Sequence, residues 1–573
     1  MSLTIETVLV PMRDGAGLAT DLWRPDGPGP WAVLLARTPY GRTSTEHLGN
    51  AKLPDVRALV EAGYAVVVQD VRGTSASPGP FEPHRFDESD TLDTLAWIAD
   101  QSWCDGTVGM WGASYMGFAQ WQAATRAPAG LHAIAPTMTS ADIYRAWHSG
   151  QGALSQSTLF NWAARMAFAN LARSDRDAEA RREDAAQILA ALDDADTLYS
   201  LPEPLRGALV RALPWFGETL AHPARDSHWE PFAALERCST ITVPALNITG
   251  WYDVFVGEVV RSYTTMRREG GSEAARDGQQ LVIGPWGHGD GADLGTFPSR
   301  SFGVSGSVKA ADITGTHLRF FDRWLRGRTD TERDARVRIF VMGLDQWRDE
   351  DDWPLPDTRY EDFFLHSGGH ANSSRGDGRL RASPAPDEVS DVFSYDPLDP
   401  VRTVGGTTLG TDGPAGPADQ AEVEERHDVL CYTSEPLTGP LEATGHVTLT
   451  VHMASSAPDT DITGKLVDVF PDGRAILLCD GLCRMRYRDA GPETRRLESG
   501  GVVEVTVDMG VTSNVFLTGH RIRLEISSSN FPRYDRNFNG GDPTTRQVAV
   551  NRIAHGPAHP SRLTLPVIQR DRT

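Results

Sequence analysis

Apolar and polar positions along the first 140 residues follow the pattern of an α/β domain. The stretches WAVLLAR (31–37) and YAVVVQD (64–70) are continuous apolar runs, which predict buried strands. Between Asp90 and Trp103 the apolar residues recur at helical spacing, so this segment predicts a helix with one face on the sheet. A further strand, TVGMWG (107–112), follows it. This alternation is typical of a largely parallel sheet covered by helices.

The pattern is interrupted once and then resumes. Residues 142–235 contain long Ala/Leu/Arg-rich stretches of helical period without strand-like runs, which predicts a helical cap inserted into the α/β domain. Strands are again predicted at 241–250, 280–287 and 337–343, with a helix at 316–327 before the last of them. An insertion that splits a parallel sheet explains this return.

The last third of the chain has a different character. After about residue 350 it becomes rich in Gly, Pro, Asp and Ser, and short alternating strands follow, such as HVTLTVHM, VVEVTVDM and RIRLEISSS. Such strands with irregular turns predict an all-β sandwich or jelly roll. The predicted domains are therefore a discontinuous α/β catalytic domain (1–141 and 236–349), a helical cap (142–235) and a jelly-roll β-domain (350–573).

Length and charge narrow the class of protein. A chain of 573 residues exceeds a single hydrophobic core, in keeping with several domains. The formal net charge of −22, without a local Lys/Arg-rich patch, argues against nucleic acid and anionic membranes as partners. The start of the chain has no basic segment followed by an apolar stretch, and no apolar run is long enough to span a membrane. We therefore expect a cytoplasmic protein.

The cysteines do not predict a disulfide framework or a metal site. There are five, an odd and small number for this length, which suits a reducing compartment. Cys479 and Cys483 are four residues apart, but no second Cys/His pair completes a metal site. We expect no structural metal and, in the absence of nucleotide-binding motifs, no cofactor.

A candidate nucleophile lies directly after the strand at 107–112. The segment Gly112-Ala113-Ser114-Tyr115-Met116-Gly117 predicts a nucleophile elbow of the G-x-S-x-G type, because a strand precedes it and the helix-like YMGFAQWQAATRA follows. In such an elbow the sharp turn lifts the serine hydroxyl above the sheet, and the flanking glycines prevent clashes. An ordinary glycine-rich turn is the plainer alternative.

A serine nucleophile needs a general base and an acid that orients the base. His288 follows the strand at 280–287, and Asp253 follows the strand before it. The order Ser114, Asp253, His288 along the chain is that of α/β-hydrolases. Asp290 and Asp293 are rival acids, but their place in the loop just after the histidine favours solvated roles.

Acyl transfer also needs two hydrogen-bond donors for the oxyanion. The backbone N–H of Tyr115, the residue after the serine, is the expected first donor. The loop ARTPYGR after an early strand lacks an HGGG-type run, so the phenol of Tyr40 is the candidate second donor. Packing in the core is an equally good explanation of this tyrosine from the spacing alone.

Longer motifs resemble one known family. The α/β-hydrolase family that bacterial cocaine esterase shares with X-Pro dipeptidyl-peptidases and α-amino-acid ester hydrolases is similar to this chain in the segments TPYGR, QDVRGTSASPG, WCDGTVGMWGASYMG, GWYDVFVGE, GPWGHG, FVMGLDQWRDEDDWP, DITGKLVDVFPDGRAILLCDG and SSSNFPRYDRN. The resemblance covers nearly the whole chain. It implies an α/β-hydrolase core, an inserted helical cap and a C-terminal jelly roll, together with a possible homodimer.

The resemblance also implies roles for individual residues. The triad roles carry over to Ser114, Asp253 and His288, and the oxyanion roles to Tyr40 and Tyr115.

The acyl pocket of a benzoate-type ester is implied at Trp147, Trp162 and Phe255, for which core packing is the alternative. On the β-domain side, where the cocaine esterase of this family has a leucine and a phenylalanine, this chain has Leu409 followed by Gly410, so the aromatic wall there is missing or differently built. The loss of one aromatic contact would cost about 1–3 kcal/mol of binding, which makes cocaine a poor candidate substrate.

These features predict a serine carboxylesterase that hydrolyses small esters with an aromatic or apolar acyl group. Two alternatives stay open. An aminopeptidase or α-amino-acid ester hydrolase would need carboxylates near the nucleophile to bind the substrate ammonium, but Met116, Val254 and Phe255 are not acidic. A non-catalytic binding protein, with the β-domain as a ligand module, is the alternative from another class.

Overall fold

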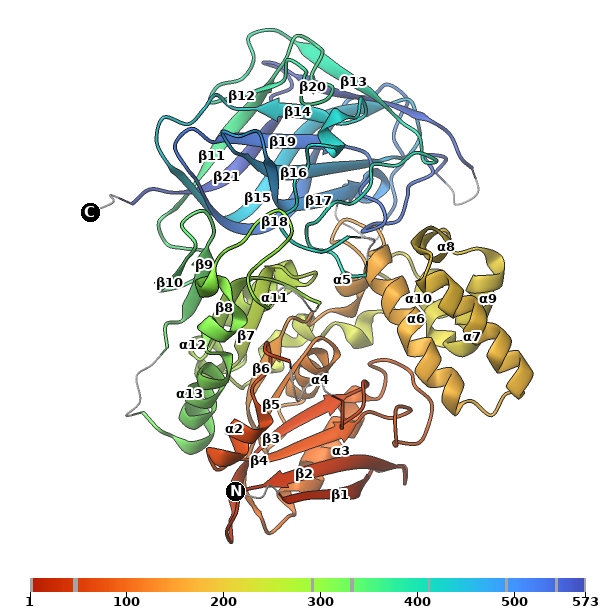
Figure 1. Cartoon of the computed structure of the whole chain (residues 1–573), viewed down its shortest axis with the longest axis vertical. Helices are drawn as coiled ribbons and strands as arrows, with labels where there is room; N and C mark the ends of the chain where they lie inside the picture. Colours follow the sequence, from red (N-terminus) through yellow and green to blue (C-terminus); the bar gives the residue numbers. More distant parts are fainter. Residues whose placement is uncertain are drawn as a thin grey trace.

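A ten-stranded sheet forms the centre of the α/β domain, in the order β1-β2-β4-β3-β5-β6-β7-β8-β9-β10 (Figure 1). Its strands are β1 (Thr4–Pro11), β2 (Gly17–Arg24), β3 (Trp31–Thr38), β4 (Ala65–Asp70), β5 (Cys104–Ala113), β6 (Leu131–Thr137), β7 (Leu246–Tyr252), β8 (Gln280–Gly287), β9 (Val337–Val341) and β10 (Gln346–Glu350). The strands from β4 across to β9 are parallel, and β1, β2 and β10 pair antiparallel at the two edges. The computed structural model describes residues 4–44, 50–289, 293–329, 334–410, 413–489, 493–541 and 545–570.

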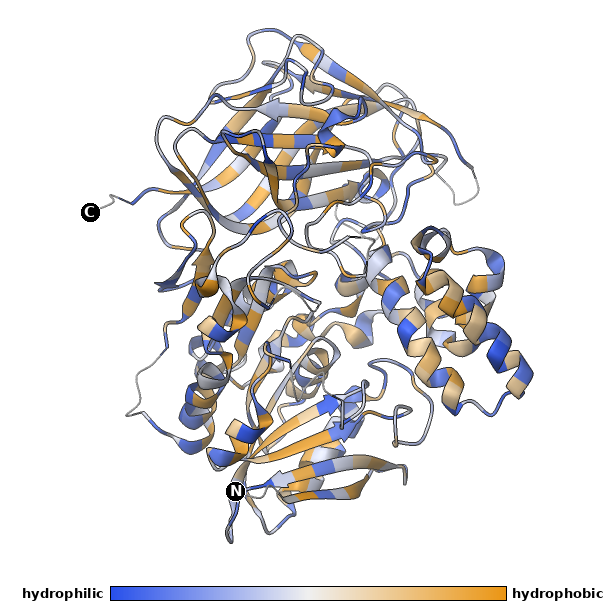
Figure 2. Ribbon diagram, in the orientation of Figure 1, coloured by the Kyte–Doolittle hydropathy of each residue, from blue (hydrophilic) through white to orange (hydrophobic). Residues whose placement is uncertain are grey.

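Helices cover both faces of this sheet, and its central strands are therefore buried at nearly every position. On one face α2 (Val56–Glu61) and α13 (Ile313–Arg326) share a core with β3 and β4. On the other face lie α3 (Asp87–Ala99), α4 (Tyr115–Ala124), α11 (Val256–Glu269) and α12 (Glu273–Asp277). Figure 2 shows the strands between these layers as strongly hydrophobic.

The predicted strand at 241–250 is shorter than expected, because β7 begins only at Leu246. A 3₁₀ segment, Ala234–Thr240, leads into it, and Pro244 lacks the N–H that a strand would use.

Six helices between β6 and β7 form the cap, as the sequence pattern indicates (Figure 1). They are α5 (Ile143–Trp147), α6 (Gln156–Arg173), α7 (Ala178–Leu192), α8 (Ala195–Ser200), α9 (Glu203–Ala212) and α10 (Pro214–Ala221). Their apolar faces, including Leu159, Ile188 and Leu209, are fully buried against one another. The interior of the cap is continuous with that of the α/β domain, because the same buried cluster includes Phe118 of α4 and Trp251 of β7.

The C-terminal part is the predicted β jelly roll. Its eleven strands are β11 (Thr358–His366), β12 (Arg379–Arg381), β13 (Val389–Tyr395), β14 (Leu430–Thr433), β15 (Leu441–Ser455), β16 (Asp461–Val469), β17 (Ala475–Arg484), β18 (Val503–Phe516), β19 (Arg521–Ser527), β20 (Ala549–His555) and β21 (Arg562–Ile568). Nearly all their pairings are antiparallel, the exception being β12 with β14. Backbone hydrogen bonds between Met342, just after β9, and β18 join this domain to the α/β core.

A buried cluster of charges lies inside the jelly roll. Glu525 on β19 is 2 % exposed and pairs in register with Lys465 of β16, whose Nζ lies 3.7 Å from the Glu525 carboxylate. Arg523 forms an ion pair with the equally buried Glu424. Burial raises the pKa of Glu525 to about 8; Lys465 opposes this shift and the neighbouring Glu424 carboxylate adds to it.

This cluster predicts a loss of stability as the pH rises. The pKa of Glu525 in the folded protein exceeds the value of about 4.3 in an unfolded chain. The folded protein therefore holds an extra proton between these two values, and its stability decreases as the pH rises through that window. We expect the free energy of unfolding of the wild type to fall more steeply between about pH 5.5 and pH 8 than that of Glu525→Gln, by up to about 1.4 kcal/mol per pH unit. The Tm of the wild type should fall more steeply over the same range, which thermal melts would measure. Glu425→Gln, at an exposed neighbouring position, is the control, and parallel Tm curves for wild type and Glu525→Gln would contradict the prediction.

Candidate active site

Ser114 occupies a strained turn between β5 and α4. Its backbone angles are φ 56° and ψ −121°, which are rare for a residue with a side chain. A Cβ on Gly112 would lie 2.5 Å from Met116, and one on Gly117 would lie 2.5 Å from Thr139, so both positions require glycine. The prediction of a G-x-S-x-G elbow was wrong in its spacing, because Met116 stands where that motif has its second glycine. Gly117, one residue later, allows the close approach of α4 instead.

Three side chains form one hydrogen-bonded series at the carboxyl ends of β5, β7 and β8. His288, directly after β8, has its Nε2 3.2 Å from Ser114 Oγ and its Nδ1 2.7 Å from Asp253 Oδ1. Asp253, directly after β7, is fully buried, and its second oxygen accepts a hydrogen bond of 2.7 Å from Thr249. The ring of Phe255 packs edge-on against the imidazole, with 5.2 Å between centroids. The imidazole is therefore held on both nitrogens and on one face.

The rival acids do not enter this series within the part of the chain that is described. Asp293 forms an ion pair of 2.7 Å with Lys52, which also donates to the Gly289 carbonyl. Asp290 lies outside the described residues.

The two tyrosines of the candidate oxyanion site line the same cavity as Ser114. Tyr115 is the first residue of α4. Its backbone N–H has no intrahelical acceptor and lies at the positive end of the helix dipole. Its phenol is buried and accepts a hydrogen bond of 3.1 Å from the His84 N–H, and burial raises its pKa well above the ordinary value. Tyr40 lies two residues after β3 and lines the same cavity as Ser114 and His288.

We expect Tyr40→Phe to lower kcat for ester hydrolysis by about 10²–10³-fold with a much smaller change in KM, because an oxyanion donor acts mainly in the transition state. Steady-state kinetics on a p-nitrophenyl ester would measure this. Tyr115→Phe is the comparison, and it should lose much less, since it keeps the backbone N–H. An unchanged kcat in Tyr40→Phe would assign the second donor to another group.

A small cavity of ≈ 40 Å³ opens beside Ser114. All the predicted site residues line it except Asp253, which lies behind His288. Trp147 and Trp162 stack with 5.4 Å between ring centroids, and Phe255 and Leu409 complete an apolar wall. Sequence reasoning missed further lining residues: His84, Phe118, Thr139, Ser140, Ile143, Ala146 and Thr158.

His84 is the most informative of the missed residues. Its backbone φ is 69°, and its ring stacks on Tyr115 at 4.4 Å and packs edge-on against Phe118 at 4.3 Å. Its Nδ1 lies 3.3 Å from Asp87, and burial lowers its pKa, which favours the neutral ring. The only hint in the sequence is the carboxylate three residues later.

The backbone at Gly410 leaves no room for a larger side chain. Its carbonyl accepts hydrogen bonds from the Tyr199 hydroxyl and from Asn161 Nδ2, both in the cap. Its φ is 73°, and a Cβ there would lie 2.3 Å from the Asn161 side chain. A larger residue therefore does not fit at position 410, and Leu409 is the one residue among the described part of the β-domain that lines the cavity.

Comparison with known proteins agrees with this arrangement. Residues 14–290 match the model of the X-Pro dipeptidyl-peptidase (S15) family, and residues 329–564 match that of the X-Pro dipeptidyl-peptidase C-terminal non-catalytic domain. Cocaine esterase from Rhodococcus sp. (strain MB1 Bresler) is 47 % identical over 98 % of this chain and 98 % of its own.

The chain belongs to the X-Pro dipeptidyl-peptidase (S15) family. Solved structures share its fold. An aminopeptidase from a marine sediment Thaumarchaeota archaeon superposes with a TM-score of 0.80 at 24 % identity, covering 99 % of this chain and 97 % of its own. An α-amino acid ester hydrolase does so with a TM-score of 0.79, also at 24 % identity, covering 99 % and 96 %.

Membership of the S15 family makes the chain a serine hydrolase with an α/β-hydrolase core and a C-terminal β-domain. Among the described residues no helix combines the length and hydropathy needed to cross a bilayer. Within the same residues, no group of three or more His, Cys, Asp or Glu side chains is arranged to hold a metal ion.

Proposed function

We propose that the protein is a carboxylesterase that cleaves esters with an aromatic or apolar acyl group, through an acyl-enzyme on Ser114. The observation that carries this proposal is the series Asp253–His288–Ser114 at the edge of an aromatic cavity, with contacts of 2.7 and 3.2 Å.

In the first step His288 Nε2 takes the proton of Ser114 Oγ, and the oxygen attacks the ester carbonyl carbon. Asp253, on Nδ1, holds the tautomer in which Nε2 is free to accept that proton, and it stabilises the imidazolium. The carbonyl oxygen becomes an oxyanion bound by the Tyr115 N–H and the Tyr40 hydroxyl. The intermediate collapses as His288 returns the proton to the departing alcohol.

Water then releases the acid by the same route. His288 takes a proton from the water, the hydroxyl oxygen attacks the acyl carbon, and the proton passes to Ser114 Oγ as the acyl–serine bond breaks. Each half-reaction conserves protons, so the side chains named here are sufficient for the chemistry.

The walls of the cavity support the proposed acyl preference. Trp147, Trp162, Phe255 and Leu409 offer aromatic and aliphatic surface to the acyl group. The relative named cocaine esterase suggests a benzoate-type ester. Because Gly410 supplies no second aromatic wall, we propose that cocaine itself is a poor substrate for this chain.

Peptidase or α-amino-acid ester hydrolase activity is the second candidate, favoured by the shared fold and family. A substrate ammonium would need carboxylates around the nucleophile. Met116, two residues after Ser114, and Val254 and Phe255, which follow Asp253, are not acidic.

The decisive experiment compares four substrates: p-nitrophenyl benzoate, p-nitrophenyl butyrate, cocaine and an amino-acid p-nitroanilide. Hydrolysis of the two p-nitrophenyl esters, with little turnover of cocaine or the anilide, is the expected result. Cleavage of the anilide alone would assign a peptidase. No turnover of any of the four substrates, together with no labelling by a fluorophosphonate, would reject the proposed esterase function.

Three further expectations remain proposals. The domain limits are those given by the sequence, 1–141 with 236–349, 142–235 and 350–573. A homodimer is proposed from the likeness to the family. A cytoplasmic location is proposed because the few cysteines, odd in number, fit a reducing compartment. Sedimentation analysis and cell fractionation would test the last two.

A further inference from the structure

The cavity beside Ser114 is small for the acyl groups proposed above. Its ≈ 40 Å³ compares with about 300–1,000 Å³ for a typical small-molecule pocket. A second cavity of ≈ 310 Å³ lies directly behind it, and His84, Ile143 and Trp147 line both. These three side chains are therefore a partition between the catalytic serine and a volume large enough for a ligand.

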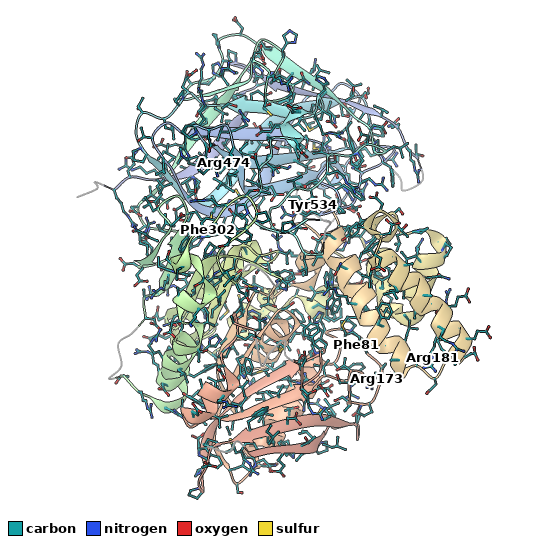
Figure 3. All side chains as sticks on the ribbon, viewed as in Figure 1. Phe81, Arg173, Arg181, Phe302, Arg474 and Tyr534 are labelled. Carbon is teal, nitrogen blue, oxygen red and sulfur yellow. The ribbon has the colours of Figure 1, made fainter. Side chains whose placement is uncertain are left out.

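A third cavity continues the same line towards the outside of the cap. It measures ≈ 530 Å³ and shares Glu82, Arg85, Trp215 and Glu218 with the second. The row of three cavities runs between the loop that follows β4 and helices α6 and α10 of the cap. Figure 3 shows Phe81 of this loop facing the cap, with Arg173 close by at the end of α6.

The chemistry of the walls changes along this row. The second cavity is lined by Ile143, Trp147, Trp229 and Phe232, which are apolar or aromatic, and also by Thr219 and His228. The residues that it shares with the third cavity include the charged Glu82, Arg85 and Glu218. An apolar chain attached to Ser114 would therefore lie in the apolar part, and only its far end would reach charged groups and solvent.

We propose that the second cavity binds the distal part of a long acyl group, a medium-chain or arylalkanoyl ester being the substrate class. This inference rests on the proposed esterase function and extends it from the reacting carbonyl to the rest of the acyl chain. The cavity beside Ser114 then holds only the first carbons of the acyl group.

Trp147 is the part of the partition that has to move. His84 is fixed by its stacking on Tyr115 and by Asp87, 3.3 Å from its Nδ1. Trp147 ends the short helix α5, and His148, which follows, is already extended. Its indole stacks on Trp162, whose ring in turn contacts Trp215 at 5.2 Å. Rotation of the Trp147 side chain joins the two cavities without breaking a helix.

Filling the second cavity tests the proposal. Thr219 on α10 is buried and lines only this cavity among the three. We expect wild type to hydrolyse p-nitrophenyl octanoate and 4-phenylbutanoate as well as acetate. Thr219→Phe should lower the octanoate-to-acetate ratio of kcat/KM by at least about tenfold, the equivalent of about two methylene groups left unburied.

A second variant keeps the test decisive if Thr219→Phe does not fold. Glu218 is exposed and lines both outer cavities, so Glu218→Cys can be labelled with benzyl methanethiosulfonate. The label should lower the same ratio, and dithiothreitol should restore it. Glu203→Cys, labelled at an exposed site on α9 that is not among the lining residues, is the matched control, alongside labelled wild type.

The outcomes separate this proposal from the esterase function itself. Acetate turnover with no octanoate turnover in wild type, or an octanoate-to-acetate ratio that neither change alters, would overturn the acyl-chain site alone. An equal shift in labelled Glu203→Cys would also overturn it. No turnover of any ester would instead reject the proposed function.

Discussion

Replacing Ser114 by alanine should lower kcat for p-nitrophenyl butyrate by about 10⁶-fold, as the loss of a triad serine does in other hydrolases. His288 would then have no hydroxyl to deprotonate, and no acyl-enzyme could form. The oxyanion donors and the cavity would remain, so slow hydrolysis by bound water is the residual reaction. Labelling by a fluorophosphonate should disappear with the activity.

The control for this variant is a serine far from the cavity. Ser102, exposed just before β5, can be changed to alanine without touching any of the residues discussed above. Its variant should hydrolyse the ester and accept the label at wild-type rates. Ester hydrolysis that survives in Ser114→Ala would mean that the nucleophile is wrong, whatever the geometry of His288.

The second large effect is expected from Asp253→Asn, which should lower kcat by about 10⁴-fold. The Asp253 carboxylate accepts from His288 Nδ1 at 2.7 Å and so keeps the proton on that nitrogen. An amide that donates to Nδ1 would move the proton to Nε2, where the ring could no longer accept from Ser114. Asparagine has nearly the same shape, so KM should change far less than kcat.

Comparing Thr249→Val with Asp253→Asn separates the positioning of the Asp253 carboxylate from its charge. Thr249 donates to the other oxygen of Asp253 at 2.7 Å. Thr249→Val removes this hydrogen bond but leaves the contact with His288, and a much smaller loss of kcat is expected. If Asp253→Asn kept most of the wild-type rate, the acid would have to be sought elsewhere.

The local sequence predicted the strands well where burial on both faces of the sheet determined their composition. Strands β3, β4 and β8 are largely apolar because helices cover both sheet faces, and this pattern is visible without a structure. Strand ends also located Asp253 and His288, because the carboxyl ends of parallel strands meet at one edge of the sheet. The predicted spacing of the glycines was wrong at the elbow. Gly117, and not residue 116, is the position where a Cβ would collide with Thr139.

The rest of the site depends on contacts between distant parts of the chain. Thr158 and Ile143 reach the cavity from the cap, and Leu409 reaches it from the jelly roll. No periodicity links these positions to Ser114. His84 was missed for the same reason, since its role follows from stacking on Tyr115 and from a backbone φ of 69° that no pattern encodes.

The join between β9 and β18 has a consequence for how such an enzyme can change over time. Met342 exchanges backbone hydrogen bonds with Ser513 and Val515, of 3.0 and 2.8 Å, and is almost fully buried. The hydrolase core and the jelly roll therefore share one interior. A mutation that weakens this contact would therefore destabilise both domains. The two domains are therefore expected to evolve together, and replacing either one with a domain from another protein would expose the shared interior.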